Sequence, residues 1–598
     1  MHHPRRRLRF RVSAPRRSLA GLLVGLAAVT LSSCGNLSVA SVDVFPVPGS
    51  RVAPPRTQIA FRGVPVDRLG RITVIGTRTG RHRGRVVADS DGRGGSFLPN
   101  RPFAPGETVT VRVAGALVAR RSHVARFRVA DPAPAFAPMP VRPASRVPGD
   151  VDSFRSRPDL RPPSVEIVHP AARSAGDVFI ANQNGPLQNG TMILDADGNL
   201  IWFHPVPDNE QASDFRVQRY HGRPVLTWWQ GALGPGVGMG EDEIYDSSYQ
   251  RVAVVRAAGG LAADLHEFQL TPNGTALITA FYPVRWDASA AHGDRQAIVL
   301  DSVVQEIDVA TGLLLFQWDS LDHVPLTDSE QAPPSHAGQP YDYFHVNSVE
   351  DDDDGSLIIS ARNTWAAYKV SHRTGRVIWR LGGKRSSFRM GPGAQFAFQH
   401  DVRVDGRDDG LLTIFDDGAG PPTVHKRSRG LVLKLNTHTR TATVAREFTH
   451  SPDLLANFEG NFQSLPDGDI FLGWGQQPYF TEFAADGATV FDGRFTGGNS
   501  SYRAYRFPWT GTPRTRPAVA ALKRGSNAIV FASWNGATEV AGWRALSGAS
   551  ADRLTAAQVV PKDGFETELS LPYARYVAVE ALDASGRVLG RSAVVAVG

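Results

Sequence analysis

An imperfect repeat between about residues 166 and 508 constrains the fold of this 598-residue chain more than any other feature. Each unit begins with a short strand-like segment that a polar residue opens, and most units continue through a turn such as Asn273-Gly274 into a more apolar segment. The five clearest units open at Asp214, His266, His345, His400 and Asn461. Units of this kind cannot bury their faces alone, so they must stack on one another.

The spacing of the units predicts a β-propeller. Successive openings lie 52, 79, 55 and 61 residues apart. These distances exceed the roughly 40 to 50 residues of a standard blade, so we expect inserted loops in the longer units. Residues 195–202 have the same pattern and belong to a unit before Asp214. Together the units predict six blades over residues 166–508.

Strand-like segments also flank the repeat, so the whole chain is predicted to be all-β. Residues 42–130 alternate polar and apolar side chains between turns, which is typical of a small immunoglobulin-like β-sandwich. Residues 510–598 resemble a fibronectin-like β-sandwich and contain no catalytic pattern. Residues 131–165 are rich in proline, which favours an extended linker. The expected architecture is a six-bladed propeller flanked by two small sandwiches.

Residues 1–33 have the pattern of a signal peptide. Arginines are followed by an apolar stretch at 19–31, which is shorter than the roughly 20 residues of a membrane-spanning helix. Next comes Leu31-Ser32-Ser33-Cys34, with the only cysteine of the chain. This resembles a bacterial lipoprotein signal, so we expect a protein outside the cytoplasm, anchored to the bacterial cell membrane by a lipid on Cys34. The alternative is an ordinary secretory signal with an incidental cysteine.

Removal of this signal changes the charge balance. The full chain has a formal net charge of +7, but seven of its 65 Lys and Arg residues lie in the first 17 positions. The remaining 58 basic residues face 58 acidic ones. A formally neutral mature protein has no general surface for polyanions, so no nucleic-acid partner is expected. The single cysteine also excludes a disulfide scaffold.

Histidines open three of the five units and are therefore candidate site residues. The first strand of each propeller blade lines the central channel, so His266, His345 and His400 are expected to converge on one funnel. Bringing imidazoles together shifts their titration and costs desolvation, which a purely structural role would avoid. Arg362 ends the second strand of the His345 unit, from where it can reach the same funnel.

The sequence around these residues resembles the bacterial arylsulfate sulfotransferase family. The motifs that carry the resemblance are Leu265-His266-Glu267, Phe344-His345-Val346-Asn347-Ser348-Val349, Ile359-Ser360-Ala361-Arg362-Asn363, Trp379-Arg380-Leu381-Gly382-Gly383 and Phe398-Gln399-His400-Asp401. The resemblance covers roughly residues 166–508 and is strongest between 340 and 420. The additional N-terminal sandwich places the chain in a divergent branch.

This resemblance implies a mechanism and a set of roles. It implies that His400 is the transiently sulfated nucleophile, that His266 and His345 support it, and that Arg362 is the family's arginine. It implies transfer of a sulfuryl group from an aryl sulfate to a phenolic acceptor without a cofactor, neither PAPS nor a metal. Two features depart from the family: Asp401 follows His400 where a small hydroxyl residue is more usual, and no cysteine pair is present for the disulfide of some members.

Two other functions remain open for the same residues. Three neutral histidines are also the ligands of a catalytic zinc in a metal-dependent hydrolase, although Arg362 would repel the cation. A secreted propeller can instead act as a non-catalytic binding protein, because the fold does not fix the function. The donor, the acceptor and the choice between a sulfate and a phosphate ester are also left open.

Overall fold

The computed structural model describes residues 40–141, 149–170, 176–336, 338–352, 354–406 and 410–598. The predicted signal peptide and Cys34 lie outside these residues. The described chain is nearly all β, which confirms the predicted fold class. Its few helical turns are η1 (Val66–Arg68), η2 (Ser289–Ala291), α1 (Ser320–His323), η3 (Leu326–Asp328) and η4 (Arg362–Thr364). None of the helices in the described ranges is long and apolar enough to cross a membrane.

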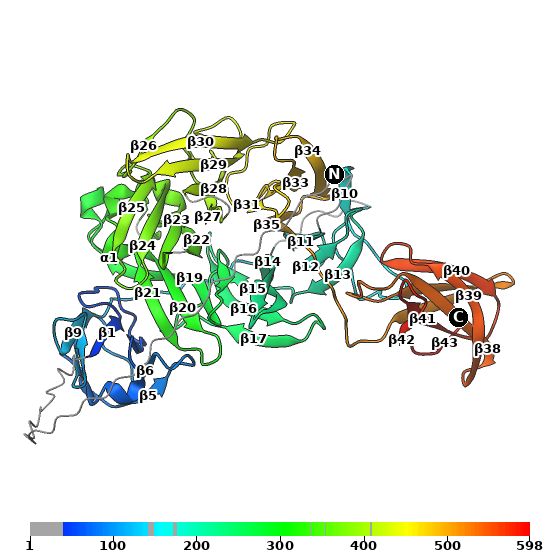
Figure 1. The fold of residues 1–598 in the computed structure, drawn as a ribbon, viewed down its shortest axis with the longest axis horizontal. Helices are drawn as coiled ribbons and strands as arrows, with labels where there is room; N and C mark the ends of the chain where they lie inside the picture. Colours follow the sequence, from blue (N-terminus) through cyan, green and yellow to red (C-terminus); the bar gives the residue numbers. More distant parts are fainter. Residues whose placement is uncertain (1–39, 142–148, 171–175, 337, 353, 407–409) are drawn as a thin grey trace, which may run out of the picture. The chain divides into compact units, whose positions relative to one another are not determined.

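Six sheets are arranged around one centre and form a six-bladed β-propeller (Figure 1). From the inner strand outward, the first three blades are β35 (Ser500–Phe507), β11 (Asp177–Gln183), β12 (Gly190–Leu194) and β13 (Leu200–Pro205); β14 (Gln211–Tyr220), β15 (Arg223–Leu233), β16 (Gly238–Tyr245) and β17 (Arg251–Val255); and β18 (Phe268–Leu270), β19 (Thr275–Trp286), β20 (Ala297–Asp308) and β21 (Leu314–Asp319).

The other three blades follow the same plan, and two of them carry a fifth strand. They are β22 (Val346–Asp351), β23 (Ser356–Ala361), β24 (Ala366–Ser371) and β25 (Val377–Gly382); β27 (His400–Val404), β28 (Leu411–Asp416), β29 (Arg429–Asn436), β30 (Thr441–Phe448) and β26 (Arg389–Met390); and β31 (Asn461–Ser464), β32 (Ile470–Gly473), β33 (Tyr479–Phe483), β34 (Thr489–Phe495) and β10 (Val165–His169).

Two pairings join the ends of the propeller. The late strand β35 forms the inner strand of the first blade, where Phe507 lies opposite Asp177 of β11. The early strand β10 pairs with β34 at the outer edge of the sixth blade. Both pairings cover sheet edges and link segments more than 300 residues apart in sequence, so the ring closes through backbone hydrogen bonds.

The hairpins at the centre follow from local sequence. Asn273-Gly274 and Asp354-Gly355 form turns between first and second strands, as predicted. Gly274 and Gly355 have φ angles of 76° and 73°, which glycine adopts without a Cβ clash. All six residues of β23 are buried. Apolar side chains of β23 and β25 pack against those of β27 to β29, so the hydrophobic cores lie between neighbouring blades.

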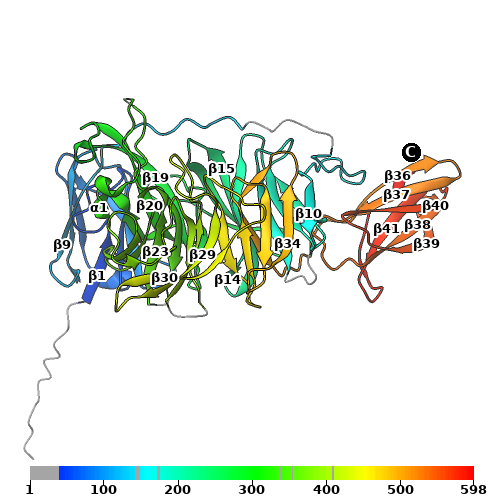
Figure 2. The same ribbon diagram turned by 90° about the horizontal axis from the view of Figure 1, so that it is seen from above.

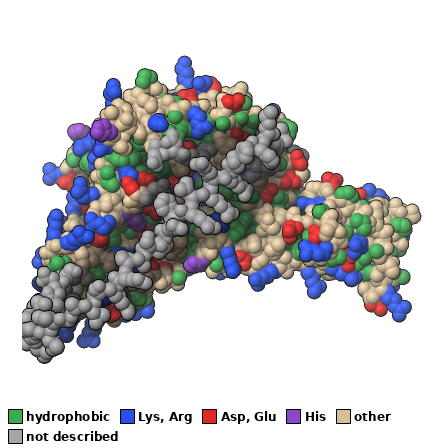
Figure 3. Space-filling view, in the orientation of Figure 1, with side chains coloured by type: hydrophobic (Ala, Val, Ile, Leu, Met, Phe, Trp, Pro, Cys, Tyr) green, Lys and Arg blue, Asp and Glu red, His purple; other side chains and the backbone are tan. Residues whose placement is uncertain are grey.

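Strands outside the propeller form two further pairs of sheets. The N-terminal sheets contain β5 (Gly84–Ala88), β6 (Gly94–Pro99), β2 (Ile59–Arg62), β1 (Ala40–Phe45) and β8 (Ala116–Val118), and β4 (Gly80–His82), β3 (Ile72–Gly76), β7 (Thr108–Val113) and β9 (Val124–Arg128). The C-terminal sheets contain β36 (Ala518–Arg524), β37 (Asn527–Ser533) and β40 (Glu566–Pro572), and β39 (Arg553–Pro561), β38 (Gly542–Ser550), β41 (Tyr576–Leu582), β42 (Val588–Arg591) and β43 (Val595–Ala596). Figure 2 shows these strands and the blades from a second direction. Basic and acidic side chains are interspersed over the face in Figure 3.

Candidate active site

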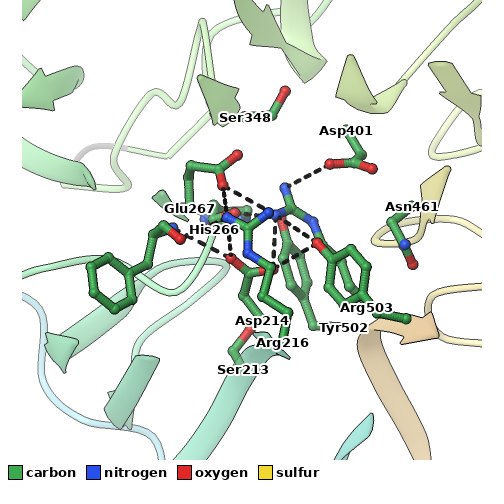
Figure 4. Close-up of polar contacts among 12 residues, drawn as sticks. Ser213, Asp214, Arg216, His266, Glu267, Ser348, Asp401, Asn461, Tyr502 and Arg503 are labelled. Atoms are coloured by element: carbon green, nitrogen blue, oxygen red, sulfur yellow. Dashed lines mark hydrogen bonds and ion pairs between the residues drawn. The ribbon is translucent and has the colours of Figure 1, made fainter. Parts of the chain in front are cut away.

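Hydrogen bonds between blades set the register of the inner strands, and Figure 4 shows the six side chains at these positions. In five of the six blades, a side chain on or next to the inner strand accepts a hydrogen bond from the backbone N–H of the next inner strand. Asp214 accepts from Phe268, Glu267 from Val349, Ser348 from Val402, Asp401 from Phe462, and Asn461 from Ala504. Arg503 closes the ring, with its Nη1 atom 3.0 Å from Oδ1 of Asp214. These six residues are therefore equivalent positions of the six blades.

Charged members of this ring form a buried ionic network with two further arginines. The ion pairs are Arg216 with Asp214 and Glu267, Arg403 with Glu267 and Asp401, and Arg503 with all three carboxylates. Burial alone would raise the pKa of Glu267, but the three arginines outweigh it and hold this pKa below its usual range. Three cations balance three anions. Asp401, where the sequence departs from the resembled family, therefore pairs with Arg403 and Arg503 in this network.

The register corrects the inferred equivalence of the unit openings, because Asp214 and Asn461 match Glu267 and Asp401 and so lie one residue after the positions of His266 and His400. His266 and His400 occupy matching positions, one residue before Glu267 and Asp401, as predicted. In the fourth blade, however, the matching residue is Asn347, and His345 lies two residues earlier. His345 precedes β22 with a φ angle of 57°, and a bulge between Val346 and Ser348 shifts the strand. Its ring still contacts that of His266, with centroids 4.8 Å apart.

Each of the three histidines is oriented by a carboxyl group at its Nδ1 atom. The pairs are His266 with Asp264, His345 with Asp342, and His400 with Asp417. A carboxylate can only accept a hydrogen bond, and the carbonyl oxygen of Phe398 next to Nδ1 of His400 is likewise an acceptor, so Nδ1 of each neutral ring carries the proton. The Nε2 atom of each neutral ring is then an unprotonated base.

His400 is held as a neutral imidazole whose Nε2 atom carries the lone pair. Its Nδ1 atom lies 2.8 Å from Oδ2 of Asp417 and 3.1 Å from the carbonyl oxygen of Phe398, and both atoms are acceptors. Its Nε2 atom accepts the backbone N–H of Glu459 at 3.3 Å. Burial, and next the positive charge of Arg362, lower the pKa of His400 well below its usual value. The uncharged ring can act as a nucleophile at neutral pH.

Arg362 brings a positively charged guanidinium close to His400. Its Nη1 and Nη2 atoms donate to Oδ1 of Asn363 and to the carbonyl oxygen of Asn457, and its guanidinium lies 4.7 Å from the ring centroid of Phe398. Its Nε atom is buried without a hydrogen-bond partner among the described residues. Burial lowers the pKa of Arg362 and raises that of Asp417. A guanidinium with a spare donor suits an anionic ester.

Aromatic rings surround these polar groups. The ring of Tyr502 lies between two histidines, with centroids 5.5 Å from His266 and 6.4 Å from His400. Phe281 lies 5.9 Å from His266 and 5.5 Å from His345, again between ring centroids. Such surroundings favour an aromatic ligand, because rings pack edge to face or offset at these distances.

Sequence reasoning missed the carboxyl partners, Tyr502 and Glu459. Asp264 and Asp342 stand only two and three residues before their histidines, so a search for carboxylates close to each candidate histidine could have found them. Asp417 lies 17 residues after His400 and needs the strand pairing to be recognised. Within the described ranges, no group of three or more His, Cys, Asp and Glu residues is placed to hold a metal ion.

Comparison with solved structures gives only distant likenesses. A Bacteroides caccae protein of unknown function is 11% identical, covering 55% of this chain and 97% of its own, with a TM-score of 0.35. The periplasmic gluconolactonase of Pseudomonas aeruginosa is 14% identical, covering 71% and 96%, at 0.30. Virginiamycin B lyase from Staphylococcus aureus is 9% identical, covering 61% and 95%, at 0.29. Scores this low carry no argument about fold or activity.

Comparison with protein families is informative. No curated protein sequence matches the chain. The arylsulfotransferase family model matches residues 216–496, which include His266, His345, Arg362 and His400. The match therefore agrees with the resemblance seen in the motifs around these four residues. Residues 216–496 of this chain, which cover most of the propeller, match the arylsulfotransferase family.

Proposed function

We propose that this protein transfers a sulfuryl group from an aryl sulfate to a phenolic acceptor through a sulfated His400, without PAPS. The observation that carries the proposal is the buried, neutral His400, whose Nδ1 proton is held by Asp417 and whose Nε2 lone pair lies in the field of Arg362. The membership of residues 216–496 in the arylsulfotransferase family supports a sulfotransferase activity.

In the first half-reaction, Nε2 of His400 attacks the sulfur atom of the aryl sulfate. The Nε2–S bond forms, the bond between sulfur and the aryl oxygen breaks, and the electron pair of that bond leaves on the aryl oxygen. The imidazole ring becomes positively charged, and Asp417 stabilises this charge through the Nδ1 proton. Arg362 binds the non-transferring oxygens while charge redistributes over the SO3 group.

In the second half-reaction, the oxygen of the acceptor phenol attacks the same sulfur. The S–Nε2 bond breaks, its electron pair returns to His400, and the neutral ring is restored. Each half-reaction needs one proton transfer: the departing aryl oxygen gains a proton and the acceptor phenol loses one. His266 and His345 line the sulfuryl group in this scheme, and the aromatic rings of Phe281 and Tyr502 hold the aryl groups.

We also propose that the reaction takes place outside the cytoplasm, with the protein anchored by lipidated Cys34. The supporting observation is the sequence pattern of residues 1–34 alone. Several acyl chains on one cysteine hold a protein at a membrane, whereas a single chain binds only marginally. Replacing Cys34 by Ser is expected to leave an unprocessed precursor or release the protein, which cell fractionation detects; normal processing and retention would overturn the anchor.

The direct test is single-turnover reaction with 4-nitrophenyl sulfate, followed by intact-mass spectrometry. The wild type is expected to gain the mass of one SO3 group and lose it when a phenol is added. His400→Ala should neither form the adduct nor release 4-nitrophenolate. His450→Ala is the matched control, because His450 is also buried beside a carboxylate, Asp492, away from the proposed site. Normal adduct formation in His400→Ala would overturn the mechanism.

The same assay separates the alternative donors and functions. Adduct formation from 4-nitrophenyl phosphate, and not from the sulfate, would reassign the transferred group to a phosphoryl group. If the wild type neither cleaves an aryl ester nor forms an adduct, the proposed activity is wrong and a binding role gains support.

A further inference from the structure

Glu459 lies at the reacting nitrogen of His400 but has no role in the scheme above. It stands two residues before β31, and its backbone N–H donates to Nε2 of His400 at 3.3 Å. Its carboxyl group is close enough to Asp417 to disfavour the ionised form of that residue. The backbone of Glu459 therefore contacts His400, and its carboxyl group lies within electrostatic range of Asp417.

The carboxyl group of Glu459 lacks the partners that a structural carboxylate has. Its Oε2 atom is buried without a hydrogen-bond partner among the described residues. Glu267, by comparison, pairs with three arginines in the same propeller. Burial without a compensating cation favours the protonated acid and raises the pKa of Glu459 to about 8.

The backbone conformation of Glu459 is also unusual. Glu459 adopts a φ angle of 71°, in the left-handed region that is unfavourable for residues with a Cβ atom. Glycine would fit this conformation better, and Gly460 follows directly with a φ angle of 102°. Strained residues of this kind concentrate at functional sites.

We propose that Glu459 is the proton donor and acceptor of the two half-reactions, an inference that rests on the proposed sulfuryl transfer. When the S–O bond of the donor breaks, the Glu459 carboxyl group gives its proton to the leaving aryl oxygen, so that a phenol departs and Glu459 becomes a carboxylate. In the second half-reaction, this carboxylate takes the proton of the acceptor phenol as its oxygen attacks sulfur. Glu459 returns to the acid form, and no external proton is consumed.

The neighbouring histidines are less suited to this task. His266 holds its Nδ1 proton against Asp264, and burial lowers the pKa of His266, so its Nε2 atom carries no proton at neutral pH. The Nδ1 atom of His345 is held in the same way by Asp342. The charged and titratable groups that the structure brings to Glu459 are His400 of β27, Asp417 after β28, and Arg362, which donates to Asn457 two residues upstream.

The test compares donors that need a proton with a donor that does not. Glu459→Gln removes the acid and keeps the shape of the side chain. Adduct formation from phenyl sulfate should slow by about 10²-fold, at the low end of what general acid catalysis contributes, because phenolate is a poor leaving group. The rate from 4-nitrophenyl sulfate should stay within about 3-fold, because 4-nitrophenolate leaves without protonation. The wild-type rate with phenyl sulfate should fall as the pH rises past about 8, and Glu459→Gln should lack this limb.

Two further variants separate catalysis from folding. Glu459→Gly suits the left-handed backbone, so it should be folded and show the same selective loss with phenyl sulfate. Glu350→Gln is the matched control, because burial also raises the pKa of Glu350, whose carboxylate accepts the backbone N–H of Val404 away from His400. This control should react with both donors at the wild-type rate.

Each outcome has one meaning. Equal slowing of both donors, or no slowing of either, in Glu459→Gln and Glu459→Gly would overturn the role of Glu459 while the wild-type adduct still supports sulfuryl transfer. Absence of any adduct in the wild type would instead refute the proposed function itself, and with it this inference.

Discussion

Oδ2 of Asp417 accepts a hydrogen bond from Nδ1 of His400 at 2.8 Å, and this contact decides which nitrogen of His400 can react. Asp417 follows β28 directly, as Arg362 follows β23 in the neighbouring blade. The residue that follows the second strand is thus a carboxylic acid in one blade and an arginine in the adjacent blade, and both belong to the candidate site. In the proposed mechanism, Asp417 orients His400 and Arg362 binds the substrate.

Asp417→Asn should impair catalysis without unfolding the protein. The amide keeps the shape of the side chain but cannot stabilise the positive charge that forms on His400, so we expect adduct formation to slow by about 10²- to 10⁴-fold. Single-turnover mass spectrometry measures this rate. Asp492→Asn, which alters the contact between a carboxyl group and Nε2 of His450, is the control. A wild-type rate in Asp417→Asn would contradict the orienting role.

Arg362 should be replaceable by lysine only in part. Arg362→Ala is expected to lower the rate of adduct formation by about 10²- to 10³-fold, the usual effect of removing one preorganised charge-stabilising donor. Arg362→Lys keeps the charge but not the planar set of donors, so its rate should lie between those of Arg362→Ala and the wild type. Arg446→Lys, at another arginine stacked on a phenylalanine, controls for loss of packing. Full activity in Arg362→Ala would exclude a role in binding the SO3 group.

The pH dependence of adduct formation should report the environment of His400. Burial and the charge of Arg362 lower its pKa well below the usual 6.5, so the nucleophile stays neutral as the pH falls through 6.5. With 4-nitrophenyl sulfate the wild-type rate should therefore remain constant across this pH. Arg362→Ala removes one cause of the shift and should move the acid limb to higher pH. A wild-type rate that declines through pH 6.5 would contradict this assignment.

Arg503→Met should destabilise the propeller. Arg503 is fully buried and pairs with three carboxylates, so its removal leaves uncompensated buried charge and is expected to cost about 3–5 kcal/mol of unfolding free energy. Arg494→Met breaks an exposed pair with Glu166 and should cost about 0–1 kcal/mol. Urea denaturation compares the two variants. Equal losses would mean that the buried network contributes no more than a surface pair.

Sequence alone predicts the parts of this fold that depend on local pattern. Short apolar strands and Asp-Gly or Asn-Gly turns repeat visibly, so the blade number and hairpins such as that at Gly355 could be predicted. The register of the inner strands could not be predicted, because the bulge between Val346 and Ser348 is not visible in the repeat pattern. His345 was therefore placed two residues out of position. Asp417 was missed because the pairing of β27 with β28 brings it to His400, and Glu459 was missed because it comes from the next blade.

Closure of the ring by β35 has a consequence for biosynthesis. Tyr502 and Arg503 both come from this late strand, so the wall between the last and first blades does not exist until residue 507 is available to pair with Asp177. A growing chain can form the blades of His266 and His400 much earlier, but their funnel stays open on one side. The propeller thus gains its finished interior only late in synthesis, and a chain truncated before β35 carries every predicted site histidine without a complete site.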